Sequence, residues 1–142
     1  EMEQSLEVEA PHARIQGYQV QEMVRDAVEL IVGCSRDPEF GPVLMIGWGG
    51  IYTEVLEDVA FLALPATSTE IERALSDLRV SKLIDGVRGL PPADREAAID
   101  AIKRLGAVFV AEGLAELDVN PLLLRPRGSG VVAVDMLAVK AP

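Results

Sequence analysis

The 142-residue sequence has almost none of the residues that build disulfides, metal clusters and hydrolytic triads. It contains one cysteine, Cys34, and one histidine, His12. An intrachain disulfide and a multi-histidine metal site are therefore excluded, and a cysteine-based zinc site is not expected. A Ser-His-Asp triad would have to use His12, which lies in a polar stretch near the start of the sequence.

Positive charge and long apolar runs are also scarce. The 13 lysines and arginines stand against 23 aspartates and glutamates, which gives a formal net charge of -10. This imbalance argues against a nucleic-acid backbone or an anionic membrane surface as the main partner. No apolar run approaches the ~20 residues that cross a bilayer, and residues 1–16 lack the apolar core of a signal peptide. With one thiol and no export signal, we expect a cytoplasmic protein.

The rest of the composition is typical of one globular domain, with 49% hydrophobic and 25% charged residues. Residues 1–16 are polar and acidic, and we interpret them as a tail or the remnant of an upstream element. The domain itself then occupies residues 17–142. Because the sequence begins Glu1-Met2-Glu3, we expect it to be a piece of something longer.

Runs of apolar and β-branched residues predict several strands in the first half of the chain. The clearest runs are residues 18–24, 28–35 and 43–48. Turn-forming residues fill positions 36–42, so we expect a β-hairpin with a long loop there. Residues 51–64 predict one or two further short strands.

Two amphipathic helices are expected next. Thr69 and Glu72 fit a capping box, in which each side chain bonds to the backbone of the other residue. The apolar residues at helical spacing in this first helix are Ile71, Ala74, Leu75 and Leu78. Pro91-Pro92 opens the second helix, which Gly113 ends. Its apolar positions are Ile99, Ile102, Leu105 and Phe109.

The last third of the sequence predicts a hairpin. Two strand-like runs, residues 114–124 and 131–139, are joined by a turn at residues 125–130. Strands, two helices and a final hairpin in this order indicate an α+β fold. We expect an antiparallel sheet with the two main helices packed on one side.

The final hairpin places oxygen-bearing side chains together. Side chains alternate along a strand, so Glu116, Asp118 and Asn120 share one face. If Leu124 pairs with Val131 across the turn, the numbers of opposed residues add up to the same total along the antiparallel hairpin, and Asn120 lies opposite Asp135. Opposed residues are about 5 Å apart at their β-carbons, which lets two oxygen ligands share one Mg²⁺. The alternative is that these residues form the solvated face of an edge hairpin, and the pattern alone leaves both readings open.

Other candidates are weaker. Glu22 and Glu29 lie among apolar residues, and each is either a carboxylate aimed at a ligand or an exposed edge residue. The run Gly47-Trp48-Gly49-Gly50 is either an anion-binding loop or a tight turn. We interpret Cys34 as a small core residue, because no neighbour in the sequence would lower the pKa of its thiol.

Five short motifs follow one another along the chain. They are Arg36-Asp37-Pro38-x-Phe40-Gly41-Pro42, Gly47-x-Gly49-Gly50-Ile51, Glu54-Val55-Leu56-x-Asp58-Val59-Ala60-Phe61, Arg88-Gly89-x-Pro91-Pro92 and Glu116-Leu117-Asp118-x-Asn120-Pro121. With them the sequence resembles the ATP-grasp domain of NDP-forming acyl-CoA synthetases, which include the ADP-forming acetate–CoA ligases. It is more distantly similar to the β subunit of succinyl-CoA synthetase. The resemblance covers residues 15–140 and implies the C-terminal subdomain of the ATP-grasp fold.

The resemblance implies roles for three residues of the final hairpin. In that family the Asn of the last motif and an Asp on the next strand bind the Mg²⁺ of the nucleotide. These positions are Asn120 and Asp135. The acidic residue two before the Asn lies near a phosphohistidine during phosphoryl transfer, and it corresponds to Asp118.

The resemblance also implies nucleotide contacts nearer the start of the chain. A Glu at the adenine hinge and another just downstream correspond to Glu22 and Glu29. The glycine loop that borders the phosphate-transfer site corresponds to Gly49 and Gly50, with Glu54 as a further catalytic candidate.

Two departures from the family pattern stand out. The family usually carries a glycine-containing turn between its two glutamates, where this chain has Val24-Arg25-Asp26-Ala27. The half of the domain that precedes residue 15 is absent from the sequence. That half supplies lysines and a glycine-rich flap that grip the triphosphate.

As the resemblance implies, the expected reaction makes acyl-CoA from an acid, CoA and ATP, with ADP and phosphate released, through acyl phosphate and phosphohistidine steps. The implied cofactors are Mg²⁺ and ATP or ADP. The expected partners are the N-terminal half of the ATP-grasp domain and the CoA-binding and phosphohistidine domains, in the same or another chain. Two alternatives remain: a non-catalytic docking or regulatory module of a fused protein acyltransferase, and a fragment that self-associates as a homo-oligomer.

Overall fold

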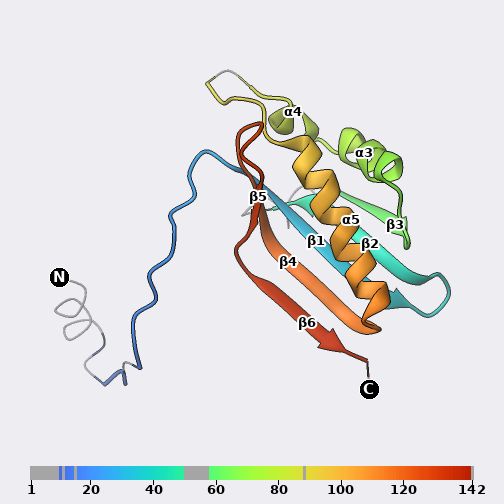
Figure 1. Ribbon diagram of the computed structural model, residues 1–142, viewed down its shortest axis with the longest axis horizontal. Coiled ribbons are helices and arrows are strands. Elements are labelled where there is room, and N and C mark those ends of the chain that lie inside the picture. The colour runs from blue at the N-terminus through green and yellow to red at the C-terminus, as the bar shows by residue number, and fades with distance from the viewer. Residues whose placement is uncertain (1–9, 11, 15, 50–57, 88, 142) are drawn as a thin grey trace.

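The computed structural model describes residues 10, 12–14, 16–49, 58–87 and 89–141 (Figure 1). Six strands and three helices occur in these ranges. In chain order they are β1 (Val28–Asp37), β2 (Gly41–Trp48), β3 (Val59–Ala63), α3 (Ser68–Asp77), α4 (Ser81–Ile84), α5 (Arg95–Ala111), β4 (Leu114–Leu124), β5 (Val131–Ala133) and β6 (Met136–Lys140). None of these helices has the length and apolar character needed to cross a membrane.

The strands form one antiparallel sheet in the order β3-β2-β1-β4-β5, with β6 also paired to β4. The helices α3 and α5 cover one face of this sheet, as Figure 1 shows. The predicted α+β fold, with an antiparallel sheet and two main helices on one side, is confirmed.

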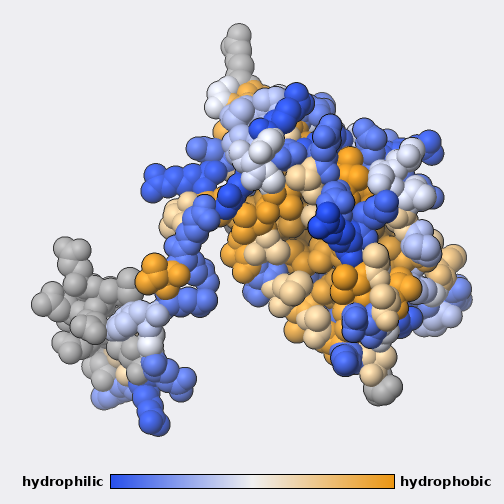
Figure 2. Space-filling model, in the orientation of Figure 1, coloured by the Kyte–Doolittle hydropathy of each residue, from blue (hydrophilic) through white to orange (hydrophobic). Residues whose placement is uncertain are grey.

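The hydrophobic core lies between the sheet and these helices. Leu30, Val32 and Cys34 alternate along β1 and are buried on the helical side. The predicted apolar stripes are also buried in part, since Ile71, Ala74, Leu75, Ile102 and Phe109 all lie in the core. Figure 2, which views the helical side, shows further apolar surface over the strands beside α5. All five residues of the edge strand β6 are exposed.

The first helix begins two residues earlier than predicted. Its N-cap is Thr67, and the capping box joins Thr67 to Glu70 rather than Thr69 to Glu72. The Glu70 carboxylate accepts from both the backbone N–H and the hydroxyl of Thr67. The sequence offers two overlapping boxes at this point, and spacing alone does not choose between them.

The predicted strand at residues 18–24 is wrong. These residues pair with no strand of the described sheet, and Val20 is 96% exposed. A tendency toward β structure produces a strand only where a partner and a buried face exist.

The predicted long hairpin loop is also wrong, because β1 and β2 remain paired up to Asp37 and Gly41. The Asp37 carboxylate accepts hydrogen bonds from the backbone N–H groups of Glu39 and Phe40. These bonds stabilise the short turn between β1 and β2.

The predicted strand at residues 131–139 is divided into β5 and β6 by Val134 and Asp135. The backbone N–H of Val134 donates to the carbonyl oxygen of Pro121 at 3.2 Å. Proline has no N–H to return a bond to Val134, so the ladder is interrupted opposite Pro121.

Asp94 connects the second helix to the turn of the final hairpin. Its carboxylate accepts from the N–H of Ala97, as an N-cap does, and also from the N–H groups of Gly128 and Gly130 at 2.9 and 2.8 Å. These bonds, with Gly130 the largest contributor, hold the pKa of Asp94 below its ordinary value. The sequence alone does not predict this link between Asp94 and the hairpin turn.

Candidate functional site

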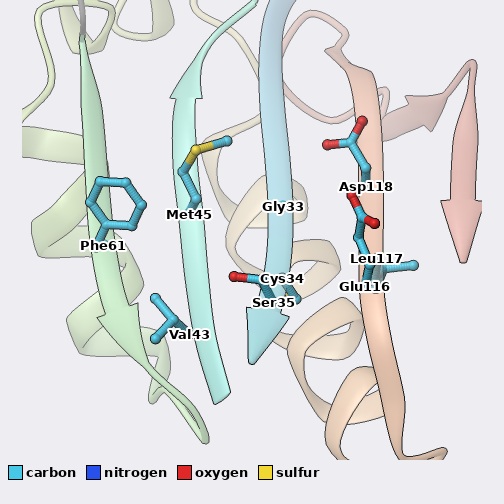
Figure 3. Close-up of a pocket in the computed structure, with 9 residues that line it drawn as sticks. All are labelled: Gly33, Cys34, Ser35, Val43, Met45, Phe61, Glu116, Leu117 and Asp118. Atoms are coloured by element: carbon cyan, nitrogen blue, oxygen red, sulfur yellow. The ribbon is translucent and has the colours of Figure 1, made fainter. Parts of the chain in front are cut away.

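The face of the sheet that the helices leave bare carries several of the candidate residues. Figure 3 shows this face, where side chains of Met45, Phe61, Glu116 and Asp118 surround Gly33. They border a shallow hollow of about 200 Å³. The hollow is apolar on the β2 and β3 side and acidic on the β4 side, so one side can contact a flat apolar group while the other meets a cation.

Gly33 forms the floor of this hollow because it has no side chain. It pairs with Met45 on one side and with Asp118 on the other. A β-carbon at this position would lie 3.5 Å from Met45 Cε and 3.7 Å from Asp118 Oδ1, which is ordinary contact. The backbone therefore tolerates an alanine at position 33, but the added methyl group would narrow the hollow.

The predicted register of the final hairpin is confirmed. Leu124 pairs with Val131, and the same constant sum of positions continues through Asp118 and Leu137. The N–H of Asn120 donates to the carbonyl oxygen of Asp135 at 3.2 Å, so these two residues are opposed at the junction of β5 and β6. Both are exposed. An amide oxygen and a carboxylate on adjacent backbone segments are the donor types that Mg²⁺ takes.

The predicted alternation along β4 is confirmed as well. Leu117 and Val119 are buried on the helical side, while Glu116 and Asn120 are exposed and Asp118 is half-buried on the other. Asp118 lies two residues before Asn120 and therefore lines the hollow next to the Asn120–Asp135 pair.

Glu29 and Gly49 are in contact where β1 begins and β2 ends. The N–H of Gly49 donates to the carbonyl oxygen of Glu29 at 2.9 Å, and the N–H of Trp48 donates to that of Asp58 at 3.1 Å. Neither N–H is free to bind an anion, so the suggested backbone cradle is wrong for these two positions. A β-carbon at Gly49 would lie 3.0 Å from Glu29 Cβ, which explains the glycine by close approach. Gly50 and Glu54 lie outside the described residues.

Along the sheet, Glu29 lies near the Asn120–Asp135 pair. Glu29 pairs with Leu123, while Val32 pairs with Val119, so an irregularity of β4 containing Asn120 falls between them. Two or three residues of a strand span ~7–10 Å. Glu29 on β1 and Asp118 and Asn120 on β4 thus lie on neighbouring strands, with Asp135 opposite Asn120 at the junction of β5 and β6.

Glu22 lies apart from the strands. Its Oε1 atom accepts from Arg125 Nη2 at 3.0 Å, and its side chain is 73% exposed. Between Glu22 and β1 the chain bends at Asp26, whose φ is 54°. This left-handed conformation is one that aspartate adopts more readily than most non-glycine residues. Asp26 therefore occupies the region where the resembled family usually carries a glycine-containing turn.

Arg36 and Cys34 lie on the helical side of the sheet. The Arg36 guanidinium lies 5.3 Å from the centre of the Phe109 ring, and its Nε donates to the Leu114 carbonyl at 2.7 Å, so Arg36 stabilises the packing of α5. Burial raises the pKa of the Cys34 thiol to about 11, which agrees with a core role and not a nucleophilic one. Within the described ranges, no group of three or more His, Cys, Asp or Glu side chains could hold a metal ion.

Comparison with known proteins gives a consistent result. A family model described as an ATP-grasp domain matches residues 1–139. The acetate–CoA ligase (ADP-forming) I of Archaeoglobus fulgidus is 39% identical over 134 residues, which are 94% of this chain and 20% of that protein. The β subunit of acetate–CoA ligase (ADP-forming) II from Pyrococcus furiosus is 33% identical over 127 residues, or 88% of this chain and 54% of the subunit.

The solved structures that resemble this fold include two with a bound nucleotide analogue. The dinucleotide-forming acetyl-coenzyme A synthetase 1 of Ca. Korarchaeum cryptofilum, in complex with coenzyme A, Ca-AMPCP and HgCl+, has a TM-score of 0.80 and 37% identity. That match covers 99% of this chain and 61% of the other. The same protein with coenzyme A and Mg-AMPPCP gives a TM-score of 0.78 and 38% identity over 85% of this chain and 56% of the other.

These matches span about half of a relative that occurs as a separate β subunit and about a fifth of a longer one. They agree with the order of motifs, the register of the final hairpin and the one-sided α+β architecture. The chain belongs to the ATP-grasp domain family.

Proposed function

We propose that this chain is the nucleotide- and Mg²⁺-binding half of an ATP-grasp acyl-CoA synthetase. The complete enzyme would convert an acid, CoA and ATP to acyl-CoA, ADP and phosphate, through acyl phosphate and phosphohistidine steps. The relatives named as ADP-forming acetate–CoA ligases support this assignment. The observation that carries it is the opposition of Asn120 and Asp135 beside the hollow that Asp118 lines.

The donor set fits Mg²⁺. Asn120 and Asp135 offer an amide oxygen and a carboxylate, and Mg²⁺ commonly takes one or two protein ligands together with substrate phosphates. When bound, the ion would offset negative charge on the transferring phosphoryl group. These two residues would hold it, and Asp118 would lie near the phosphorylated histidine of another domain.

The remaining residues would bind the nucleotide. Glu22, on the segment before β1, would contact the base at the adenine hinge. Glu29, on β1, would contact another part of the nucleotide. Gly49 permits the close approach of the loop after β2 to Glu29, which sets the border of the site. Gly50 and Glu54 are proposed as further site residues from the sequence motif alone.

The bare face accounts for the proposed partners. It carries the exposed apolar side chains of Phe61 and Leu137 together with the carboxylates. We infer that the N-terminal half of an ATP-grasp domain covers it, with CoA-binding and phosphohistidine domains in the same or another chain. Within this proposal, residues 17–142 form the subdomain and residues 1–16 belong to a tail or upstream element.

The substitution Asp135→Asn in the full-length protein tests the metal role. It keeps the size of the side chain and removes the charge that the cation needs, so phosphoryl transfer should fall at least a hundredfold, or ~2.7 kcal/mol in barrier, with little change in thermal stability. Asp100→Asn on the exposed surface of α5 is the matched control and should leave turnover unchanged. Turnover of Asp135→Asn within about twofold of wild type, or ~0.4 kcal/mol, would make the metal role untenable.

A further inference from the structure

An ion pair joins two parts of the chain that are 103 residues apart. Arg125 Nη2 donates to Glu22 Oε1 at 3.0 Å. The Glu22 side chain is 73% exposed, whereas that of Arg125 is only 27% exposed. We propose that Arg125 is a positioning residue that holds Glu22 in place for the base of the nucleotide. This inference rests on the role of Glu22 in the proposed function.

Hydrogen bonds hold the backbone of Arg125 in place. Its backbone N–H donates to the carbonyl oxygen of Gly130 at 3.1 Å, and its own carbonyl accepts from the N–H of Asp94 at 2.8 Å. Asp94 in turn binds the N–H groups of Gly128 and Gly130. The guanidinium therefore extends from a backbone tied both to the final hairpin turn and to the start of α5.

Glu22 lies on the segment that precedes β1. Residues 16–25 belong to no strand or helix, and Figure 1 shows the segment leaving the sheet beside β5. The bend at Asp26 separates it from β1. A side chain on such a segment samples many positions, and each must be lost when a ligand binds. An ion pair with a rigidly held arginine removes part of that cost in advance.

The pairing leaves Glu22 able to act on a base. Arg125 occupies Oε1, and a carboxylate has further lone pairs on its second oxygen. The exocyclic amino group of adenine is a donor that such an oxygen can accept. The positive guanidinium also offsets the charge of Glu22, which reduces the repulsion of an anionic nucleotide.

An exposed ion pair by itself contributes little to stability, so the test needs a matched pair without the proposed role. Arg104 and Asp100 on α5 provide one, with a contact of 2.8 Å and both side chains more than half exposed. Arg104→Ala removes a surface ion pair in the same way as Arg125→Ala. Arg104 lies in the second half of α5, whereas the hairpin turn that carries Arg125 lies at the N-terminal end of that helix.

The first measurement concerns the contact and uses this chain without nucleotide. Backbone order from ¹⁵N relaxation should fall over residues 20–25 in Arg125→Ala and stay unchanged in Arg104→Ala. The charge-exchanged pair Glu22→Arg with Arg125→Glu should restore that order. Unchanged order in Arg125→Ala would overturn the inference, whatever nucleotide binding shows.

The second measurement concerns function and uses the full-length protein. Arg125→Ala should raise the KM for ATP about tenfold with kcat within about twofold, the pattern of lost binding that does not affect chemistry. Arg125→Lys should recover part of the loss, because it keeps the charge but not the fork of donors. The charge-exchanged pair should not recover KM, because the base then meets no acceptor at position 22.

The double variant Glu22→Gln with Arg125→Ala separates the positioning role of Arg125 from the proposed role of Glu22 in binding the base. If Arg125 acts through Glu22, Arg125→Ala should add little to the KM of Glu22→Gln. Fully additive effects, or a normal KM in Arg125→Ala beside a raised KM in Glu22→Gln, overturn the positioning role and leave the proposed function standing. A normal KM in Glu22→Gln overturns both roles of that pair, while Asp135→Asn still reports on the metal site independently.

Discussion

The Asp94 carboxylate accepts a hydrogen bond from the N–H of Gly130 at 2.8 Å and thereby ties the start of α5 to the turn between β4 and β5. The same turn carries Arg125, and the strand before it carries Asn120. The second helix and the final hairpin are therefore fixed relative to each other by a buried side chain that takes no part in the proposed chemistry.

Asp94 should make stability depend on pH. Its pKa is lowered in the folded chain, so its contribution is complete above its unfolded value of about 4 and is lost as the pH falls through the folded value. At pH 7, Asp94→Asn should lower the free energy of unfolding by about 1–2 kcal/mol. Urea denaturation from pH 7 downward should show this difference shrinking below about pH 4. Asp77→Asn, exposed at the end of α3, should show no such pattern, and a pH-independent deficit for Asp94→Asn would contradict this account.

Gly33→Ala should separate folding from function. A methyl group there makes ordinary contacts with Met45 and Asp118, and alanine loses less entropy than glycine in a strand. The free energy of unfolding should therefore stay the same or rise by up to ~1 kcal/mol. In the full-length protein the narrowed hollow should lower kcat at least tenfold, or ~1.4 kcal/mol. Gly17→Ala, which has no atom within 4 Å of its β-carbon, is the control. A normal kcat in Gly33→Ala would remove the hollow from the proposed site.

This chain on its own should bind Mg-ATP weakly, although it carries the proposed metal ligands. Its net charge of -10 and the carboxylates on its bare face repel a tetra-anionic nucleotide. Arg36 gives no compensation, because it packs over Phe109 on the helical side. We expect a dissociation constant of about a millimolar or weaker, near -4 kcal/mol, measured by calorimetry. Binding at a few micromolar would show that this half of the site is sufficient.

Cys34 should resist alkylation while the chain is folded. Its thiol is 3% exposed and its pKa is raised to about 11, so the reactive thiolate is rare at pH 8. Labelling by iodoacetamide should be at least a hundredfold slower in native buffer than in concentrated urea. Comparable rates in the two conditions would mean that β1 opens readily.

Much of the fold could be predicted because periodicity reports on burial. Ile71, Ala74 and Leu75 recur at helical spacing and are buried, and the pairing of Leu124 with Val131 follows from the turn between them. That pairing alone placed Asn120 opposite Asp135. The prediction of a strand at residues 18–24 failed because these residues have β character but no partner in the described sheet.

The contacts that the sequence could not predict are those between distant residues. No local pattern indicates that Asp94 binds Gly130, that Arg36 lies over Phe109, or that Asp58 accepts from the N–H groups of Arg79 and Val80. The contact between Glu22 and Arg125 is of the same kind. A charged residue in a turn is ordinarily solvated, so only the folded arrangement distinguishes these side chains from their neighbours.

Because helices cover only one face of the sheet, adjacent residues of a strand are under different constraints. Leu117 is buried among core residues, whereas Asp118, next to it in the chain, is half-buried and lines the hollow on the other face. Ser35, Met45 and Glu116 on the bare face can accordingly be varied together without disturbing the packing that folds the chain. For protein engineering, the chain is a one-layer scaffold whose reactive surface can be redesigned, or drift in evolution, independently of the core behind it.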